Sequence, residues 1–174
     1  MGRILTILLI IFLGAAIVYG SRSYFVSGAT VIDNHTGLRW TRCSMLSGET
    51  IDVSRGCTGN PVKYTWEGAI NACEHLELAG ISNWRLPNVR ELQSIATHYR
   101  FRTPMIDPRV FPNTVDGQYW SSTTYNESKT DVNPDAGDYA WVFDFYYANI
   151  TPVHKEYGAN HTAYEVYVRC VSGP

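Results

Sequence analysis

Four cysteines are the residues of this sequence with the most specific chemistry: Cys43, Cys57, Cys73 and Cys170. They contain no Cys-x-x-Cys pair and have no histidine pair at ligand spacing beside them, so they do not indicate a zinc site. In an exported chain, an even number of cysteines indicates disulfides. Among the three pairings that four cysteines allow, we favour Cys43 with Cys57, which closes a local loop, and Cys73 with Cys170, which ties a helix to the last strand.

Arginines make the central third of the chain locally basic. A guanidinium binds sulfate or carboxylate groups through two parallel hydrogen bonds, so Arg100, Arg102 and Arg109 are candidate ligands for an acidic or sulfated glycan. The alternative is that these three are ordinary surface charges. For Arg85 we expect a structural role within the fold.

Aromatic residues crowd the last third of the chain. Most of them should be core residues, because alternation places Tyr139, Trp141, Phe143 and Phe145 on one face of a strand. Exposed aromatic rings can stack on sugars or anchor protein partners. The candidates for such contact lie near loop edges, and they are Tyr125, Tyr147 and Tyr157.

An acidic stretch contains oxygen ligands at alternate positions, Asp131, Asn133 and Asp135, as the start of a calcium loop does. The likeness ends there, because Ala136 stands where an EF-hand needs glycine and Val142 where it needs a bidentate glutamate. We therefore favour a solvated turn over a calcium site. No other cofactor is indicated.

An enzymatic function is not expected. His154 and His161 have no recognisable nucleophile or ligand partner nearby in the sequence, and lone histidines are usually surface residues. Ser121 and Ser122 lie outside any Gly-x-Ser-x-Gly motif.

The N-terminus resembles an export signal, with a charged start followed by an apolar run over residues 4–18. This run is shorter than the roughly 20 residues of a spanning helix, so cleavage before Ser21 is favoured over an uncleaved anchor. We expect a signal peptide over residues 1–20 and an exported protein that is periplasmic, on the cell surface or secreted. Residues 21–174 have the usual size of a single domain. The formal net charge of -2 argues against nucleic-acid partners.

The periodicity of the chain predicts an α+β fold. Residues 24–32 and 38–41 should form a hairpin through the turn at 33–37. Helices are predicted over residues 66–76, capped by Thr65, and 89–96, capped by Asn88. Strands are predicted over residues 119–124, 139–146, 149–153 and 164–171, with Cys170 facing inward. The two helices should pack on small twisted antiparallel sheets, with the connection over residues 125–138 outside the core.

Five sequence blocks in this order resemble one family. They cover residues 31–40 (VIDNHTGLRW), 66–73, 84–87 (WRLP) with Glu91 and Leu92, 119–123 (YWSST) and 167–171 (YVRCV). The chain resembles the Lcl (Legionella collagen-like) C-terminal domain family of bacteria over nearly all of its expected mature length. This resemblance implies a C-type-lectin-like fold with a long bridge from a helix to the last strand. It also implies relatives among surface adhesins that bind sulfated glycans, and no catalytic residues.

From the residues and the resemblance together, we expect an extracytoplasmic, non-enzymatic binding module, lectin-like or adhesin-like, for sulfated or acidic glycans. The alternative is a structural subunit of a surface appendage or oligomer that uses the same loops for protein contacts. Under either function, the partners of the protein would be a glycan or a surface protein, or further copies of the same chain. A membrane would be contacted only through an uncleaved N-terminal segment.

Overall fold

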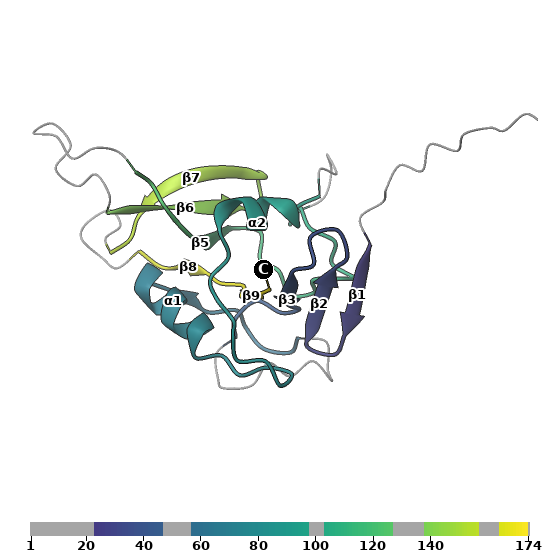
Figure 1. Cartoon of the computed structure of the whole chain (residues 1–174). Coiled ribbons are helices and arrows are strands. Elements are labelled where there is room, and N and C mark those ends of the chain that lie inside the picture. Colours follow the sequence, from purple (N-terminus) through teal and green to yellow (C-terminus); the bar gives the residue numbers. More distant parts are fainter. Residues whose placement is uncertain (1–22, 47–56, 98–102, 127–137, 157–163, 174) are drawn as a thin grey trace, which may run out of the picture.

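The computed structural model describes residues 23–46, 57–97, 103–126, 138–156 and 164–173. Within these ranges the chain forms two helices and nine strands (Figure 1). In chain order they are β1 (Tyr24–Ser27), β2 (Thr30–Asp33), β3 (Arg39–Thr41), β4 (Lys63–Tyr64), α1 (Trp66–Glu74), α2 (Val89–Ser94), β5 (Gln118–Thr124), β6 (Tyr139–Asp144), β7 (Asn149–His154), β8 (Val166–Tyr167) and β9 (Val171–Ser172).

The strands form two sheets, in the orders β1-β2-β3-β9 and β4-β8-β5-β6-β7. The expected α+β class is therefore confirmed. The expectation of purely antiparallel sheets was wrong, because β5 and β8 pair in parallel, with Tyr119 opposite Tyr167. A parallel pair joins segments that are distant in the sequence, and local alternation carries no signal for it.

The opening hairpin lies at β2 and β3, where Gly37 adopts a φ of 74° that suits glycine. The carboxylate of Asp33 stabilises this turn by accepting a hydrogen bond from the backbone N–H of His35 at 3.0 Å. The predicted single strand over residues 24–32 was wrong, because a turn at Gly28 and Ala29 divides it into β1 and β2.

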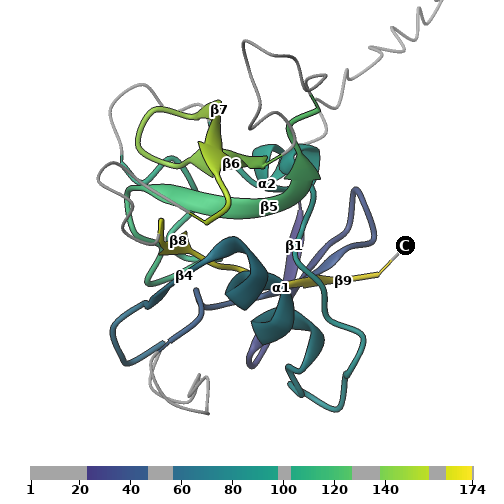
Figure 2. The same ribbon diagram turned by 90° about the vertical axis from the view of Figure 1, so that its left-hand side faces the viewer.

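Both predicted helix caps are present. The Thr65 hydroxyl accepts a hydrogen bond from the backbone N–H of Gly68, and Asn88 forms a reciprocal capping box with Glu91. The helices end at Glu74 and Ser94, short of the predicted ends at residues 76 and 96. In Figure 2, α2 lies beside β5 and β6, while α1 lies near β4 and β5.

The five-stranded sheet is buried on both faces. Tyr119 and Phe143 belong to one core cluster, and their neighbours Trp120 and Val142 belong to the other. Since successive residues of a strand point to opposite faces, both faces are covered. This corrects the expectation of one core face in β6, because Ala140 on the other face is fully buried while Tyr139 and Trp141 on the predicted face are only half-buried.

The C-terminal segment passes from one sheet to the other. We expected a single strand over residues 164–171, but β8 belongs to the five-stranded sheet and β9 to the four-stranded one. Between them, Val168 and Cys170 bond through their carbonyls to the backbone N–H groups of Met45 and Thr41. The C-terminal segment is thus bonded to the end of β3 and to the residues that follow it as it passes between the two sheets.

Both expected disulfides are present, Cys43–Cys57 and Cys73–Cys170. The second ties α1 to the segment between β8 and β9, and both of its cysteines are fully buried. Within the ranges that the structure describes, no helix is long and apolar enough to cross a membrane.

Candidate ligand-binding cleft

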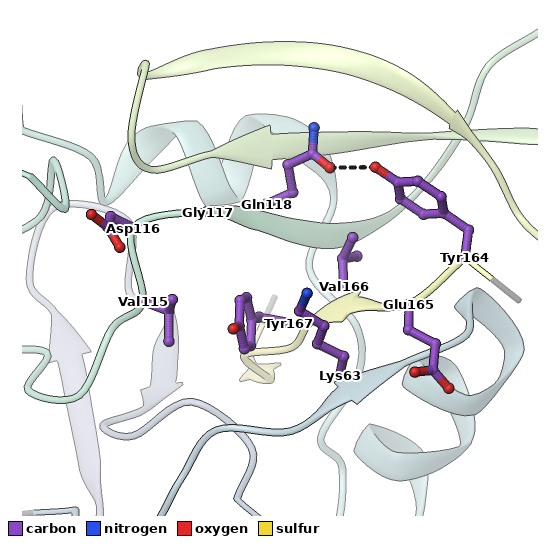
Figure 3. Close-up of a pocket in the computed structure, with 9 residues that line it drawn as sticks. All are labelled: Lys63, Val115, Asp116, Gly117, Gln118, Tyr164, Glu165, Val166 and Tyr167. Carbon is purple, nitrogen blue, oxygen red and sulfur yellow. Dashed lines mark hydrogen bonds between the residues drawn. The ribbon is translucent and has the colours of Figure 1, made fainter. Parts of the chain in front are cut away.

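A cleft of about 420 Å³ is lined by residues in and next to β4, β8 and β5, which are neighbours in the five-stranded sheet (Figure 3). We call it the β5–β8 cleft. Its walls come from three distant parts of the chain: β4, the segment leading into β5, and the segment leading into and forming β8. The lining residues are Lys63, Val115, Asp116, Gly117, Gln118, Tyr164, Glu165, Val166 and Tyr167.

Strand pairing brings these walls together. Tyr167 in β8 stands opposite Lys63 in the antiparallel β4 and opposite Tyr119 in the parallel β5. The Tyr167 ring packs on the fully buried Tyr119 ring, with centroids 5.6 Å apart. The aromatic wall of the cleft is therefore fixed from behind by a core side chain.

Tyr119 is itself held by hydrogen bonds. Its hydroxyl lies 2.7 Å from the Ser44 hydroxyl and accepts from the backbone N–H of Val115 at 3.0 Å. Burial raises the pKa of the Tyr119 phenol above its usual value, so this hydroxyl stays protonated at neutral pH and can donate. Val115 lines the cleft, so this bond positions the wall that carries Asp116 and Gly117.

A fully buried arginine supports the same wall. Arg169 donates to the carbonyl oxygens of Thr41 at 2.7 Å and Arg42 at 2.6 Å, and to the hydroxyl of Thr114 at 2.8 Å. Its guanidinium also lies 5.0 Å from the Phe111 ring centroid. Burial lowers the pKa of Arg169 to about 10. Among the described residues no carboxylate pairs with it, so carbonyls, hydroxyls and an aromatic face stabilise its charge.

The polar groups that line the cleft fall into two classes. Tyr164 donates its hydroxyl to Oε1 of Gln118 at 2.7 Å, which fixes both side chains (Figure 3). Burial, and then the charge of Asp144, raise the pKa of Tyr164. By contrast, Asp116 and Glu165 are exposed and form no ion pair within the described part of the chain.

Lys63 lies in the middle of the lining, with its ammonium 5.3 Å from the centroid of the Tyr167 ring. Figure 3 shows Asp116 at one end of the lining and Glu165 at the other, with Lys63 and Tyr167 between them. The cleft thus combines aromatic surface with hydrogen-bond donors and acceptors, and its charged groups are two carboxylates and one ammonium. Such a site can bind a polar organic ligand that has both apolar faces and hydroxyl or amine groups.

A second hollow, of about 500 Å³, lies at the start of α1 between Trp66 and Lys155. The Lys155 ammonium already covers the Trp66 ring at 4.3 Å from its centroid and donates to the Thr124 hydroxyl at 3.2 Å. The aromatic face of this hollow is therefore occupied by the protein itself, which makes it the weaker candidate.

The described residues contain no group of three or more His, Cys, Asp or Glu side chains that could hold a metal ion. The weak calcium candidates Asp131, Asn133 and Asp135 lie outside the described ranges.

Of the residues predicted for ligand contact, the structure describes Arg109, Tyr125 and Tyr147, and none of these three lines the cleft. Arg109 forms an ion pair with Asp107, with its Nη2 2.8 Å from Oδ2 and its Nε 3.1 Å from Oδ1. Tyr125 makes an edge contact with Trp141, and Tyr147 is 67 % exposed at the turn between β6 and β7. Arg100, Arg102 and Tyr157 lie outside the described residues.

The structural role expected for Arg85 is confirmed. Its guanidinium makes two hydrogen bonds to the Glu91 carboxylate, at 2.8 and 2.7 Å. These bonds raise the pKa of Arg85.

Sequence reasoning missed Lys63, Asp116, Gln118 and Glu165. These four are ordinary polar residues at scattered positions, and no spacing in the sequence connects them. Only Tyr167 lay within a block that carried the family resemblance, and nothing there marked it as part of a cleft.

A family model described as the Lcl C-terminal domain matches residues 29–172. This range includes every residue that lines the β5–β8 cleft. A search of curated proteins finds no significant match.

Proposed function

The chain belongs to the Lcl C-terminal domain family, and from this premise we propose that it is an extracytoplasmic module that binds a glycan and performs no catalysis. Family membership supports a surface-associated domain. The two disulfides are consistent with an oxidising, extracytoplasmic compartment. We also infer a C-type-lectin-like fold, which the long Cys73–Cys170 bridge supports.

The observation that carries this proposal is the composition of the β5–β8 cleft. A sugar ring has C–H faces that pack on aromatic surface and a rim of hydroxyls that both donate and accept hydrogen bonds. Tyr164 and Tyr167 supply the aromatic surface, and Lys63, Asp116 and Gln118 supply donors and acceptors around it. The backing by Tyr119 and Arg169 holds this surface in place before any ligand arrives. Such preorganisation reduces the entropic cost of binding.

The two carboxylates of the cleft lie on different walls, because Asp116 precedes β5 and Glu165 precedes β8. In Figure 3, Asp116 and Glu165 stand at opposite ends of the lining, with the side chains of Lys63 and Tyr167 between them. This arrangement suits contacts to separate parts of one ligand.

The site we propose differs from the arginine patch that the sequence suggested. Arg109 pairs with Asp107 in the described structure, so a sulfate would compete with this carboxylate for the guanidinium. The β5–β8 cleft contains more carboxylates than ammonium groups. Its charge favours neutral or basic sugars over sulfated ones.

The test is an array of neutral, basic and sulfated glycans, probed with the mature protein at low and high salt. We expect binding that is lost in Gly117→Leu, because a Cβ at this position would lie 3.5 Å from the Tyr167 ring and a longer side chain would fill the cleft. Tyr147→Ser, at an exposed position outside the cleft, is the control and should bind normally. The melting temperature of each variant checks that it is folded.

Two results would contradict the proposal. A blank array for the wild-type protein would exclude glycan binding. Full binding by a folded Gly117→Leu variant would place the glycan site elsewhere.

A structural subunit is the second candidate function, and exposed apolar side chains favour it. Tyr146, Tyr147 and Ile150 are 43 %, 67 % and 40 % exposed around the turn between β6 and β7, and Phe25 on β1 is 58 % exposed. Exposed aromatic side chains of this kind can anchor protein contacts. Concentration-dependent oligomers in sedimentation experiments, together with a blank glycan array, would favour this function.

A further inference from the structure

We propose that the β5–β8 cleft selects saccharides that carry free ammonium groups, that is, short oligomers of an amino sugar without N-acetyl groups. This inference rests on the proposed glycan-binding function and adds the chemical class of the ligand.

The first argument is the charge balance of the lining. Asp116 and Glu165 contribute two negative charges and Lys63 one positive charge. Two carboxylates outside the cleft already have a protein partner, in the ion pairs Arg85–Glu91 and Arg109–Asp107. The two carboxylates of the cleft have no such partner in the described ranges, so a cationic ligand can pair with them without displacing a protein group.

The second argument is the order of the groups along the cleft. Lys63 is held between the two carboxylates by its contact with the Tyr167 ring, 5.3 Å from the centroid (Figure 3). Its ammonium repels a ligand amine at the centre and donates to hydroxyl or ring oxygens there. Ligand amines are therefore favoured at the two ends, beside Asp116 and Glu165, which requires a ligand with more than one amino-sugar unit.

The third argument is that the neutral groups complete sugar recognition. Gln118 accepts from the Tyr164 hydroxyl through Oε1, which leaves its amide N–H groups to donate to a ligand. Gly117 leaves the Tyr167 ring uncovered on one side, because a Cβ there would lie in contact with it. A volume of about 420 Å³ is within the range of pockets that bind small organic ligands.

The experiment compares two tetrasaccharides with the same backbone, β-1,4-linked glucosamine and β-1,4-linked N-acetylglucosamine. Affinities are measured by calorimetry at mildly acidic pH, which keeps the amines of the glucosamine oligomer protonated. We expect the glucosamine oligomer to bind more tightly at low salt, by up to about fivefold for each carboxylate contact. The difference should shrink at high salt, and it should be smaller for the disaccharides.

Isosteric variants identify the groups responsible. Asp116→Asn with Glu165→Gln removes both charges and keeps the shapes, so it should abolish the preference for glucosamine over the acetylated oligomer. Lys63→Gln removes the repulsion at the centre and should increase the preference. Glu77→Gln, at an exposed position outside the cleft, is the matched control and should change neither affinity.

The failures of the two proposals are distinguishable. Equal affinities for the two tetrasaccharides, or a preference that survives in the Asp116→Asn/Glu165→Gln variant, would overturn the amino-sugar inference and leave glycan binding intact. If neither tetrasaccharide binds but another glycan on the array does, the inference also fails while the function stands. Only a blank array together with no tetrasaccharide binding would overturn both.

Discussion

At the scale of single residues, Arg169 is the most unusual feature of the core. A buried arginine normally pairs with a carboxylate, because removing a charge from water is costly. Here the guanidinium bonds instead to the carbonyls of Thr41 and Arg42 and to the hydroxyl of Thr114. The guanidinium of Arg169 therefore connects the C-terminal segment to the end of β3 and to Thr114, which precedes the cleft wall.

This role predicts that Arg169→Lys is strongly destabilising. The lysine retains the cost of burying a positive charge, but its compact ammonium cannot reach the same set of acceptors. We expect the free energy of unfolding to fall by about 2–4 kcal/mol, measured by urea denaturation. Arg90→Lys, at an exposed position, is the control. Loss of less than about 0.5 kcal/mol, the usual range for a surface substitution, would show that the bonding pattern of Arg169 is unimportant.

At the scale of elements, the short helix α2 depends on its N-terminus. Asn88 accepts from the backbone N–H of Glu91 at 2.9 Å, and the Glu91 carboxylate accepts from the backbone N–H of Asn88 at 2.7 Å. The same carboxylate binds Arg85, in the segment before the helix. A helix of this length has little stability of its own, so these bonds and the burial of Leu92 hold it on the sheet.

Replacement of the cap therefore has a graded effect. Asn88→Ala should lower the free energy of unfolding by about 1 kcal/mol, whereas Asn88→Gly should lower it by only a few tenths, because glycine is tolerated at N-caps. Chemical denaturation of the two variants measures this difference. Equal losses would indicate that the Asn88 side chain contributes through packing and not through the cap.

At the scale of the whole molecule, the two disulfides constrain the chain to different extents. Cys43–Cys57 spans a sequence separation of 14 and Cys73–Cys170 one of 97. A cross-link reduces the entropy of the unfolded chain more when the loop is longer. The long bridge also joins α1 to the segment that links the two sheets, so it connects most of the fold.

We therefore expect the paired substitution Cys73→Ala/Cys170→Ala to cost about 4–5 kcal/mol and Cys43→Ala/Cys57→Ala about 3 kcal/mol of unfolding free energy. The two variants are compared by urea denaturation under identical non-reducing conditions. The expectation would be contradicted if removal of the short bridge cost as much as removal of the long one.

The sequence by itself determined the parts of this protein that depend on local patterns. The caps at Thr65 and Asn88, the hairpin turn ending in Gly37 and the even set of cysteines each carry their own chemistry over a few residues. The ordered blocks also identified the family. These features could be read from the chain because hydrogen-bond caps, turns and disulfides use particular residue types.

Only the tertiary structure decided which polar residues lie together in the β5–β8 cleft. The parallel pairing of β5 with β8 brings Lys63, Asp116 and Glu165 to one cleft, although they are distant in the sequence. Arg169 is also fully buried, although alternation gave no reason to place it inside. The physical reason is that strand pairing between distant segments is set by the packing of the whole core, and no local periodicity encodes which polar residues it will place side by side.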